Sequence, residues 1–143
     1  AVNPKIGREI PLPQFATAGS AAMDLHACVD APVTLKAGER AVIPTGLAMA
    51  LPSGTYVALV FARSGLGIKK GVCLSNGVGV IDSDYRGEIA VGLVNLSAED
   101  YTVQAGDRIA QLMVVPVVQP TISLVPELDD TDRGSGGFGS TGR

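Results

Sequence analysis

Short apolar runs separated by turn residues are the feature that most constrains the fold of this chain. The runs cover residues 41–44, 47–51, 56–61, 72–74, 89–95, 101–104 and 109–118, with Gly-, Pro-, Ser- and Asp-containing turns between them. No window of a dozen residues keeps the 3.6-residue periodicity of a helix, and residues 64–70 are the best candidate for one short helix. Strands at this spacing predict an all-β sandwich or barrel.

The composition limits the chain to one globular domain and excludes several kinds of function. The 143 residues are 46% hydrophobic and only 4% aromatic, without Trp, so Val, Leu, Ile and Ala must form the core. A net charge of −3 argues against a general nucleic-acid binder. Cys28, Cys73 and the single His26 suit neither a disulfide framework nor an ordinary zinc site.

No segment approaches the length and hydropathy of a membrane span, so no membrane partner is expected. The first residues lack the apolar core of a signal peptide, which predicts a cytoplasmic protein. Since residue 1 is not Met, a removed organelle-targeting peptide remains an alternative.

The run at 112–118 has no polar residue at alternate positions, so both faces of that strand must be covered. A second sheet can cover one face and a neighbouring subunit the other, which predicts an oligomer. After Leu128 the composition changes to Asp, Thr, Arg, Gly and Ser, which bury too little apolar surface to order a chain. We therefore expect a folded domain over 1–128 and a flexible C-terminal arm over 129–143.

Residues 75–88 combine a predicted hairpin with a carboxylate at the end of an apolar run. Gly77 and Gly79 allow backbone angles and close approaches that other residues do not. Val80 and its apolar neighbours favour a strand, which places Asp82 where the strand meets a turn. The exposed amides of such a hairpin could bind the edge of a nucleobase. The alternative is an ordinary Asn-Gly hairpin with a solvated Asp-Ser-Asp loop, and Asp82 with Asp84 would make only a weak divalent-ion site.

Two further segments suit phosphate groups. Ser64 is a natural helix N-cap, and Arg63 beside it has a guanidinium fork that matches phosphate oxygens. In the tail, a base could stack on Phe138 while Arg133, Ser140 and Thr141 hold phosphates. The alternatives are a capped surface helix and a Gly-Ser-rich linker.

Asp24 and Gln111 are polar residues within apolar stretches. Asp24 is expected to be partly buried beside a partner or a metal-bound water. Gln111 follows a Gly-Asp turn in a predicted strand, where one satisfied amide is the simpler interpretation. His26 is interpreted as a structural histidine, because no Ser-His-Asp pattern accompanies it.

Five motifs follow one another at 21–25, 62–71, 75–88, 106–112 and 133–142. Their specific parts are Arg63-Ser-Gly65, Gly79-Val-Ile-Asp-Ser-Asp-Tyr-Arg-Gly87, Gly106-Asp-Arg-Ile-Ala-Gln111 and Arg133-Gly-Ser-Gly-Gly-Phe-Gly-Ser-Thr141. In these motifs and in their order, the chain resembles the trimeric dUTP pyrophosphatases (dUTPases). Ala62 and Ala22 stand where the family usually has Pro and Gly, which affects local backbone geometry rather than reacting groups.

The resemblance implies a distorted jelly-roll β domain, a homotrimer with shared active sites, and Mg²⁺-dependent hydrolysis of dUTP to dUMP and pyrophosphate. This reaction keeps uracil out of DNA and supplies dUMP for thymidylate synthesis. Asp82 would activate the water that attacks the α-phosphorus, and Asp24 would hold the water shell of Mg²⁺. The uracil and deoxyribose contacts would be Asn76, Gly77, Val80, Tyr85 and Phe138. The phosphate contacts would be Arg63, Ser64, Gly65, Gln111, Arg133, Ser140 and Thr141.

Two rival functions differ in their expected residues. A dCTP deaminase shares this fold, but it needs a catalytic Glu where this chain has Gly92. A non-catalytic nucleotide-binding regulator, or a plain interaction module, would have no need to keep Asp82, Gln111 and the arm together.

Overall fold

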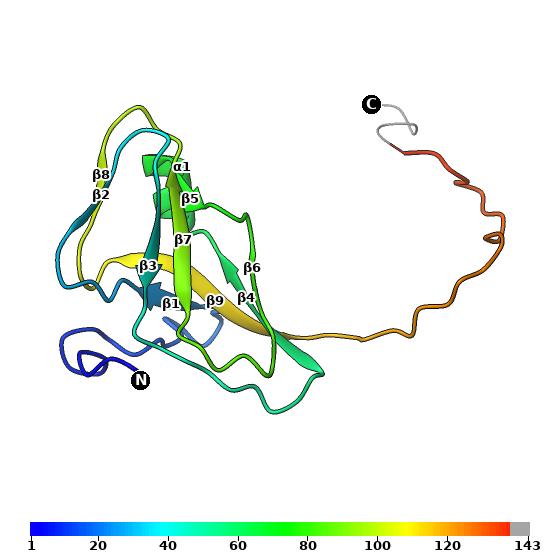
Figure 1. Ribbon diagram of the computed structural model, residues 1–143, viewed down its shortest axis with the longest axis horizontal. Coiled ribbons are helices and arrows are strands. Elements are labelled where there is room, and N and C mark those ends of the chain that lie inside the picture. The colour runs from blue at the N-terminus through cyan, green and yellow to red at the C-terminus, as the bar shows by residue number, and fades with distance from the viewer. Residues whose placement is uncertain (138–143) are drawn as a thin grey trace.

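The computed structural model describes residues 1–137 and shows a β-sandwich with a single short helix in that part of the chain (Figure 1). All strand pairs are antiparallel and fall into a four-stranded sheet of order β1-β9-β4-β6, a three-stranded sheet β3-β7-β5 and a two-stranded ribbon β2-β8. The elements are β1 (Met23–His26), β2 (Val33–Leu35), β3 (Arg40–Pro44), β4 (Tyr56–Phe61), α1 (Ser64–Lys70), β5 (Val72–Leu74), β6 (Gly79–Ile81), β7 (Ala90–Asn95), β8 (Tyr101–Val103) and β9 (Arg108–Pro116). The all-β prediction is confirmed.

The core lies between these sheets and consists of small and branched aliphatic side chains, as the composition predicts. Its largest fully buried hydrophobic side chains are Leu25, Leu35, Ile43, Leu93 and Ile109. Alternate residues of β7 and β4 point into it, which gives these strands the two-residue burial pattern of a half-covered sheet.

The predicted strands at 56–61 and 72–74 match β4 and β5, and the predicted helix matches α1. The predicted strand at 47–51 is wrong: this segment has no regular structure, although the Leu47 carbonyl accepts a hydrogen bond from the distant Ile89 amide (2.7 Å). Gly46, with φ +70°, turns the chain before it. The predicted strand at 109–118 ends early, at Pro116, the last residue of β9.

Ser64 is not the N-cap of α1, which corrects the prediction. The cap position belongs to Arg63, in an extended conformation (φ −83°, ψ 134°) and without a side-chain capping bond, so Ser64 is the first helical residue. The helix closes at Gly71 in the left-handed conformation (φ +66°). A Cβ at Gly71 would lie 2.9 Å from the Cβ of Ser97, so only glycine fits this turn.

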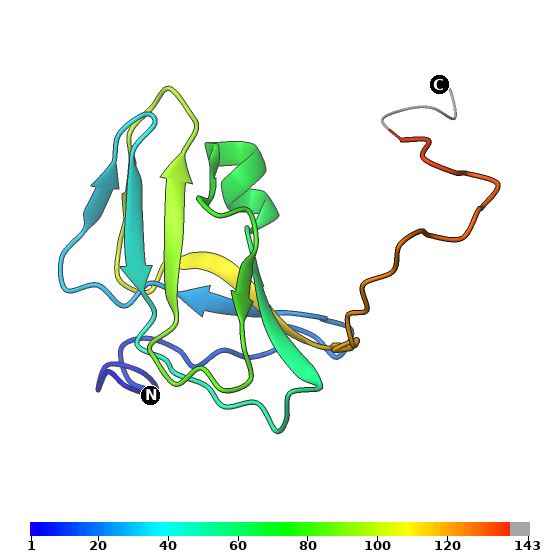
Figure 2. The ribbon, with the colours of Figure 1, turned by 45° about the vertical axis from the view of Figure 1, so that its right-hand side comes forward.

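After β9 the chain leaves the sandwich, and Figures 1 and 2 show residues 117–137 extending away from it. The apolar side chains there are exposed: Leu124 is fully accessible and Ile122 is 89% accessible. The proposed boundary near residue 128 stays a prediction. Among the described residues, no helix has the length and hydropathy needed to cross a membrane.

Candidate active site

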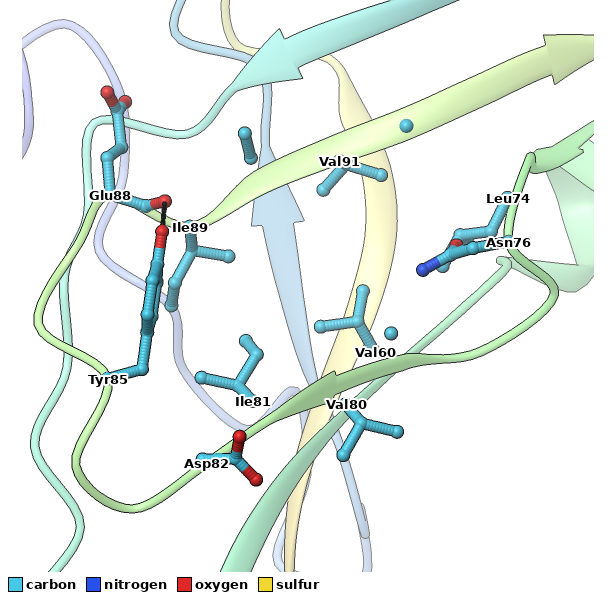
Figure 3. Close-up of a pocket in the computed structure, with 13 residues that line it drawn as sticks. Val60, Leu74, Asn76, Val80, Ile81, Asp82, Tyr85, Glu88, Ile89 and Val91 are labelled. Atoms are coloured by element: carbon cyan, nitrogen blue, oxygen red, sulfur yellow. Dashed lines mark hydrogen bonds between the residues drawn. The ribbon is translucent and has the colours of Figure 1, made fainter.

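A cavity of about 280 Å³ opens at one edge of the sandwich, where β6 of one sheet faces β7 of the other (Figure 3). Buried aliphatic side chains of Val60, Ile89 and Val91 line it. Asn76 and Tyr85 lie on opposite sides, and Asp82 lies where β6 ends (Figure 3). The cavity therefore joins an apolar interior to three polar side chains that the sequence singles out.

The segment from 75 to 78 is not a hairpin turn, which corrects the prediction. Its flanking strands belong to different sheets, because β5 pairs with β7 whereas β6 pairs with β4. Gly77 supplies the positive φ (+75°) for this turn, and the Val78 amide donates to the Asn76 carbonyl (2.9 Å). Because the turn crosses between sheets instead of closing a ladder, it leaves the space between β6 and β7 open. The cavity is a consequence of this crossing.

Gly79 allows β6 to lie close to β4. A Cβ at this position would be 3.0 Å from the Cβ of Val60, and the φ angle of Gly79 is ordinary. Close packing, and not backbone freedom, is the reason for this glycine. Val80 next to it is 65% exposed and contributes to the cavity rim.

Asp82 follows the last residue of β6, and the Tyr85 amide donates to its carbonyl (3.2 Å). The prediction that this aspartate sits where a strand meets a turn is confirmed. The Tyr85 ring lines the cavity, and its hydroxyl donates to the Glu88 carbonyl (3.2 Å; Figure 3). Sequence reasoning missed Glu88 and Ile89 as lining residues. A glutamate followed by an isoleucine is common just before any strand, so these residue types do not indicate a binding site.

A second group of polar residues surrounds Asp24. One Asp24 oxygen accepts from the Arg63 Nε (2.8 Å), and the other accepts from an Arg108 terminal nitrogen (3.3 Å). The sequence predicts a partner for this partly buried carboxylate, and the structure shows two, the guanidinium groups of Arg63 and Arg108. Gln111 pairs with Asp24 across the β1–β9 ladder, and both line a separate cavity of about 290 Å³. Arg108 was missed, because the strand register that brings it beside Asp24 is not visible in the sequence.

His26 lies on the same strand as Asp24 and has no hydrogen-bond partner at its buried Nδ1. Burial lowers the pKa of His26 below its ordinary value, the nearby Asp24 opposes this, and Arg108 and Arg63 lower it further. The imidazole is therefore held in its neutral form near neutral pH.

The cavity beside Asp82 and the polar residues around Asp24 lie at opposite ends of β4. Ile81, next to Asp82, pairs with Ala58 of β4, whereas Arg63, which binds Asp24, lies five residues after Ala58 in the chain. Five extended residues span about 17 Å. Ser64 and Gly65 are exposed at the Arg63 end, where Gly65 and Arg63 line a third cavity.

Arg133 lies in the exposed C-terminal segment, where its Nε donates to the Gly136 carbonyl (3.0 Å). Phe138, Ser140 and Thr141 lie outside the described residues. Within residues 1–137, no group of three or more His, Cys, Asp or Glu side chains could hold a metal ion.

Comparison with known proteins identifies the family. The dUTPase family model matches residues 8–142. Two relatives named deoxyuridine 5'-triphosphate nucleotidohydrolase, from Idiomarina loihiensis and Escherichia coli, are 52% and 48% identical over 142 residues, covering 99% of this chain and 94% of each relative.

Two solved structures of similar fold come from staphylococcal phages. A variant of the bacteriophage 80alpha dUTPase with dUpNHpp matches with a TM-score of 0.85 and 27% identity, over 95% of this chain and 94% of that chain. A variant of the phage phi11 dUTPase, described for its coordination of a structural Mg(II) ion, matches with a TM-score of 0.76 and 25% identity over 86% of this chain and 94% of that chain. The predicted jelly-roll fold is confirmed, and this chain belongs to the dUTPase family.

Proposed function

We propose that this protein hydrolyses dUTP to dUMP and pyrophosphate by attack of water on the α-phosphorus. One observation carries the proposal: an apolar cavity between the sheets with Asn76, Tyr85 and Asp82 at its edge, in a chain of the dUTPase family. The relatives are named for dUTP hydrolysis, and the 80alpha structure holds dUpNHpp, which resembles a nucleoside triphosphate. The reaction would keep uracil out of DNA and supply dUMP.

The cavity would take the uracil base and the deoxyribose. Its volume of about 280 Å³ suits a nucleobase with its sugar and not a much larger ligand. The Asn76 amide and the main chain around Gly77 and Val80 would pair with the polar edge of uracil. Cytosine has a different pattern of donors and acceptors and would leave these protein groups unpaired, which discriminates strongly against it. The narrow cavity would exclude thymine by the bulk of its methyl group. Tyr85 would pack against the sugar.

Asp82 would act as the general base. Its exposed carboxylate at the end of β6 can reach a water molecule at the mouth of the cavity and accept its proton. A positioned base contributes about 10²–10⁴-fold to the rate. The remaining acceleration would come from alignment of the triphosphate and from stabilisation of charge by arginine side chains.

The residues fit a Mg²⁺ ion that is held mainly by the substrate. Asp24 is the expected protein group, and both of its oxygens already accept from guanidinium groups. A carboxylate in that state suits contact with the water shell of an ion better than direct ligation. Mg²⁺ bound to the phosphates would neutralise their negative charge.

We further propose a homotrimer in which each active site combines three chains. The separation of the Asp82 cavity from Arg63, Ser64, Gly65 and Gln111 supports this, since one chain presents the two groups far apart. The exposed apolar tail after β9 supports contacts with other subunits. The arm over 129–143 would close a neighbour's site, with Phe138 on the base and Arg133, Ser140 and Thr141 near the γ-phosphate. A cytoplasmic location stays a prediction.

The deciding experiment measures pyrophosphate release from dUTP, with dTTP, dCTP and UTP as controls. We expect release from dUTP in the presence of Mg²⁺ and little from the other three. Ammonia release from dCTP would favour a deaminase, and binding of dUTP without turnover would favour a regulator. The mass in solution, measured by light scattering, tests the trimer.

A further inference from the structure

Gly87 lies against the end of the Tyr85 side chain. A Cβ placed on Gly87 would overlap the Tyr85 hydroxyl and lie 2.5 Å from Cζ of the ring. Gly87 has an ordinary φ angle, so its backbone does not require glycine. The space that the missing side chain leaves is filled by the tyrosine.

The ring of Tyr85 folds back over its own turn. Its hydroxyl donates to the Glu88 carbonyl (3.2 Å), three residues further along the chain, and Figure 3 shows the ring standing beside Ile89 at the cavity edge. Tyr85 is 47% exposed, so neighbouring side chains do not enclose it fully. The hydroxyl bond and the bare Cα of Gly87 together set its position.

Glu88 is itself fixed to a different segment. Its Oε1 accepts a hydrogen bond from the Gly46 amide (2.7 Å). At the next residue, the Ile89 carbonyl accepts from the hydroxyl of fully buried Thr45 (2.6 Å), and the Ile89 amide donates to the Leu47 carbonyl (2.7 Å). The acceptor for the Tyr85 hydroxyl is thus anchored on the segment that follows β3.

We propose that Gly87 and Glu88 are positioning residues that hold the Tyr85 ring as the sugar-side wall of the cavity and so determine the preference for dUTP over UTP. This inference rests on the proposed function. A ring fixed on both sides leaves no room for a 2′-hydroxyl, whereas a ring free to swing outward admits one.

Gly87→Ala tests the inference directly. The new methyl group displaces the far end of one exposed side chain and no backbone, so the protein folds and Tyr85 moves outward. We expect the ratio of kcat/KM for dUTP to that for UTP to fall about fivefold or more, mainly because KM for UTP falls once the ring no longer excludes the 2′-hydroxyl. Gly19→Ala is the control, because its Cβ meets no atom within 4 Å.

A double-mutant cycle separates positioning from a general structural effect. Without the Tyr85 side chain, the methyl group at position 87 has nothing to displace. In a Tyr85→Ala background, Gly87→Ala should therefore change the dUTP/UTP ratio less than twofold. An equal loss in both backgrounds overturns the inference, as does an unchanged ratio in the single variant.

Glu88 offers a matched pair of substitutions. Glu88→Gln keeps an oxygen acceptor for the Gly46 amide, whereas Glu88→Ala removes it. The ratio of kcat/KM for dUTP to that for UTP should fall for Glu88→Ala and stay near the wild-type value for Glu88→Gln. Thermal unfolding of both variants checks that they are folded. Equal ratios for these two variants remove Glu88 from the inference.

The outcomes distinguish this inference from the proposed function. Absence of dUTP hydrolysis in the wild-type protein contradicts the proposed function. Normal hydrolysis, with a ratio that responds to Tyr85→Ala but not to Gly87→Ala, leaves that function intact and refutes the positioning role.

Discussion

Asn95, the last residue of β7, is the buried polar side chain whose removal should destabilise the fold most. It is fully buried, and its Nδ2 donates to the carbonyls of Leu35 (2.9 Å) and Glu99 (2.7 Å). Its Oδ1 accepts from the amide (3.0 Å) and hydroxyl (2.8 Å) of Ser97. This single side chain therefore joins the end of β2 to the turn that leads into β8.

Asn95→Leu keeps the approximate volume and removes all four bonds. The buried bond to Leu35 leaves a carbonyl without a partner, which costs about 2 kcal/mol, and the more accessible bonds cost about 0.5–1 kcal/mol each. We expect the free energy of unfolding to fall by about 4 kcal/mol. For a chain of this size that corresponds to a melting temperature lower by about 10 °C.

Urea unfolding followed by circular dichroism, at a fixed protein concentration, measures this change. Ser97→Ala is the matched control, because it leaves three of the four Asn95 bonds in place. It removes only the bonds of the Ser97 hydroxyl, which join it to Asn95 Oδ1, the Glu99 carbonyl and the Glu99 amide. It should cost about 1 kcal/mol. A loss for Asn95→Leu no larger than that for Ser97→Ala would refute the reasoning.

Three further predictions concern the site and its surroundings. Asp82→Asn should fold and bind dUTP but lose turnover by about 10²-fold or more, while Asp84→Asn keeps it; full activity of Asp82→Asn contradicts the assignment of the base. A chain that stops before Arg133 should remain a trimer and lose about tenfold or more in activity, and an unimpaired truncate would make the arm a linker. Because the pKa of His26 is lowered in the folded state, the unfolded state binds more protons, so stability is fully present above pH 6.5 and falls below it. His26→Gln should flatten that decline in urea titrations between about pH 7 and pH 5, and an unchanged slope argues against it.

The strands that sequence patterns predict best are those with long apolar runs. β4, with residues Tyr56–Phe61, is bounded by clear turn residues and is predicted correctly. β1 and β2 span only four and three residues and contain polar residues, so they do not stand out as apolar runs, whereas the equally short β5 is apolar throughout. The wrong strand at 47–51 has the right composition but lacks a partner ladder, which composition cannot reveal.

The candidate site depends on pairing that no local pattern encodes. Asn76, Asp82 and Tyr85 were found from a motif, and the structure brings them to one cavity. That cavity exists because β5 and β6 belong to different sheets, whereas the local sequence indicates a hairpin. Arg108 escaped notice for the same reason, since its contact with Asp24 depends on the β1–β9 register.

The position of Tyr85 also has an optical consequence. The chain has three tyrosines and no tryptophan, so these three rings dominate its near-ultraviolet emission. One of the three forms a wall of the cavity, with its hydroxyl bound to a main-chain carbonyl. A ligand that packs against this ring alters the surroundings of a third of the fluorophores. Titration of the unlabelled protein by tyrosine fluorescence can therefore report occupancy of the cavity.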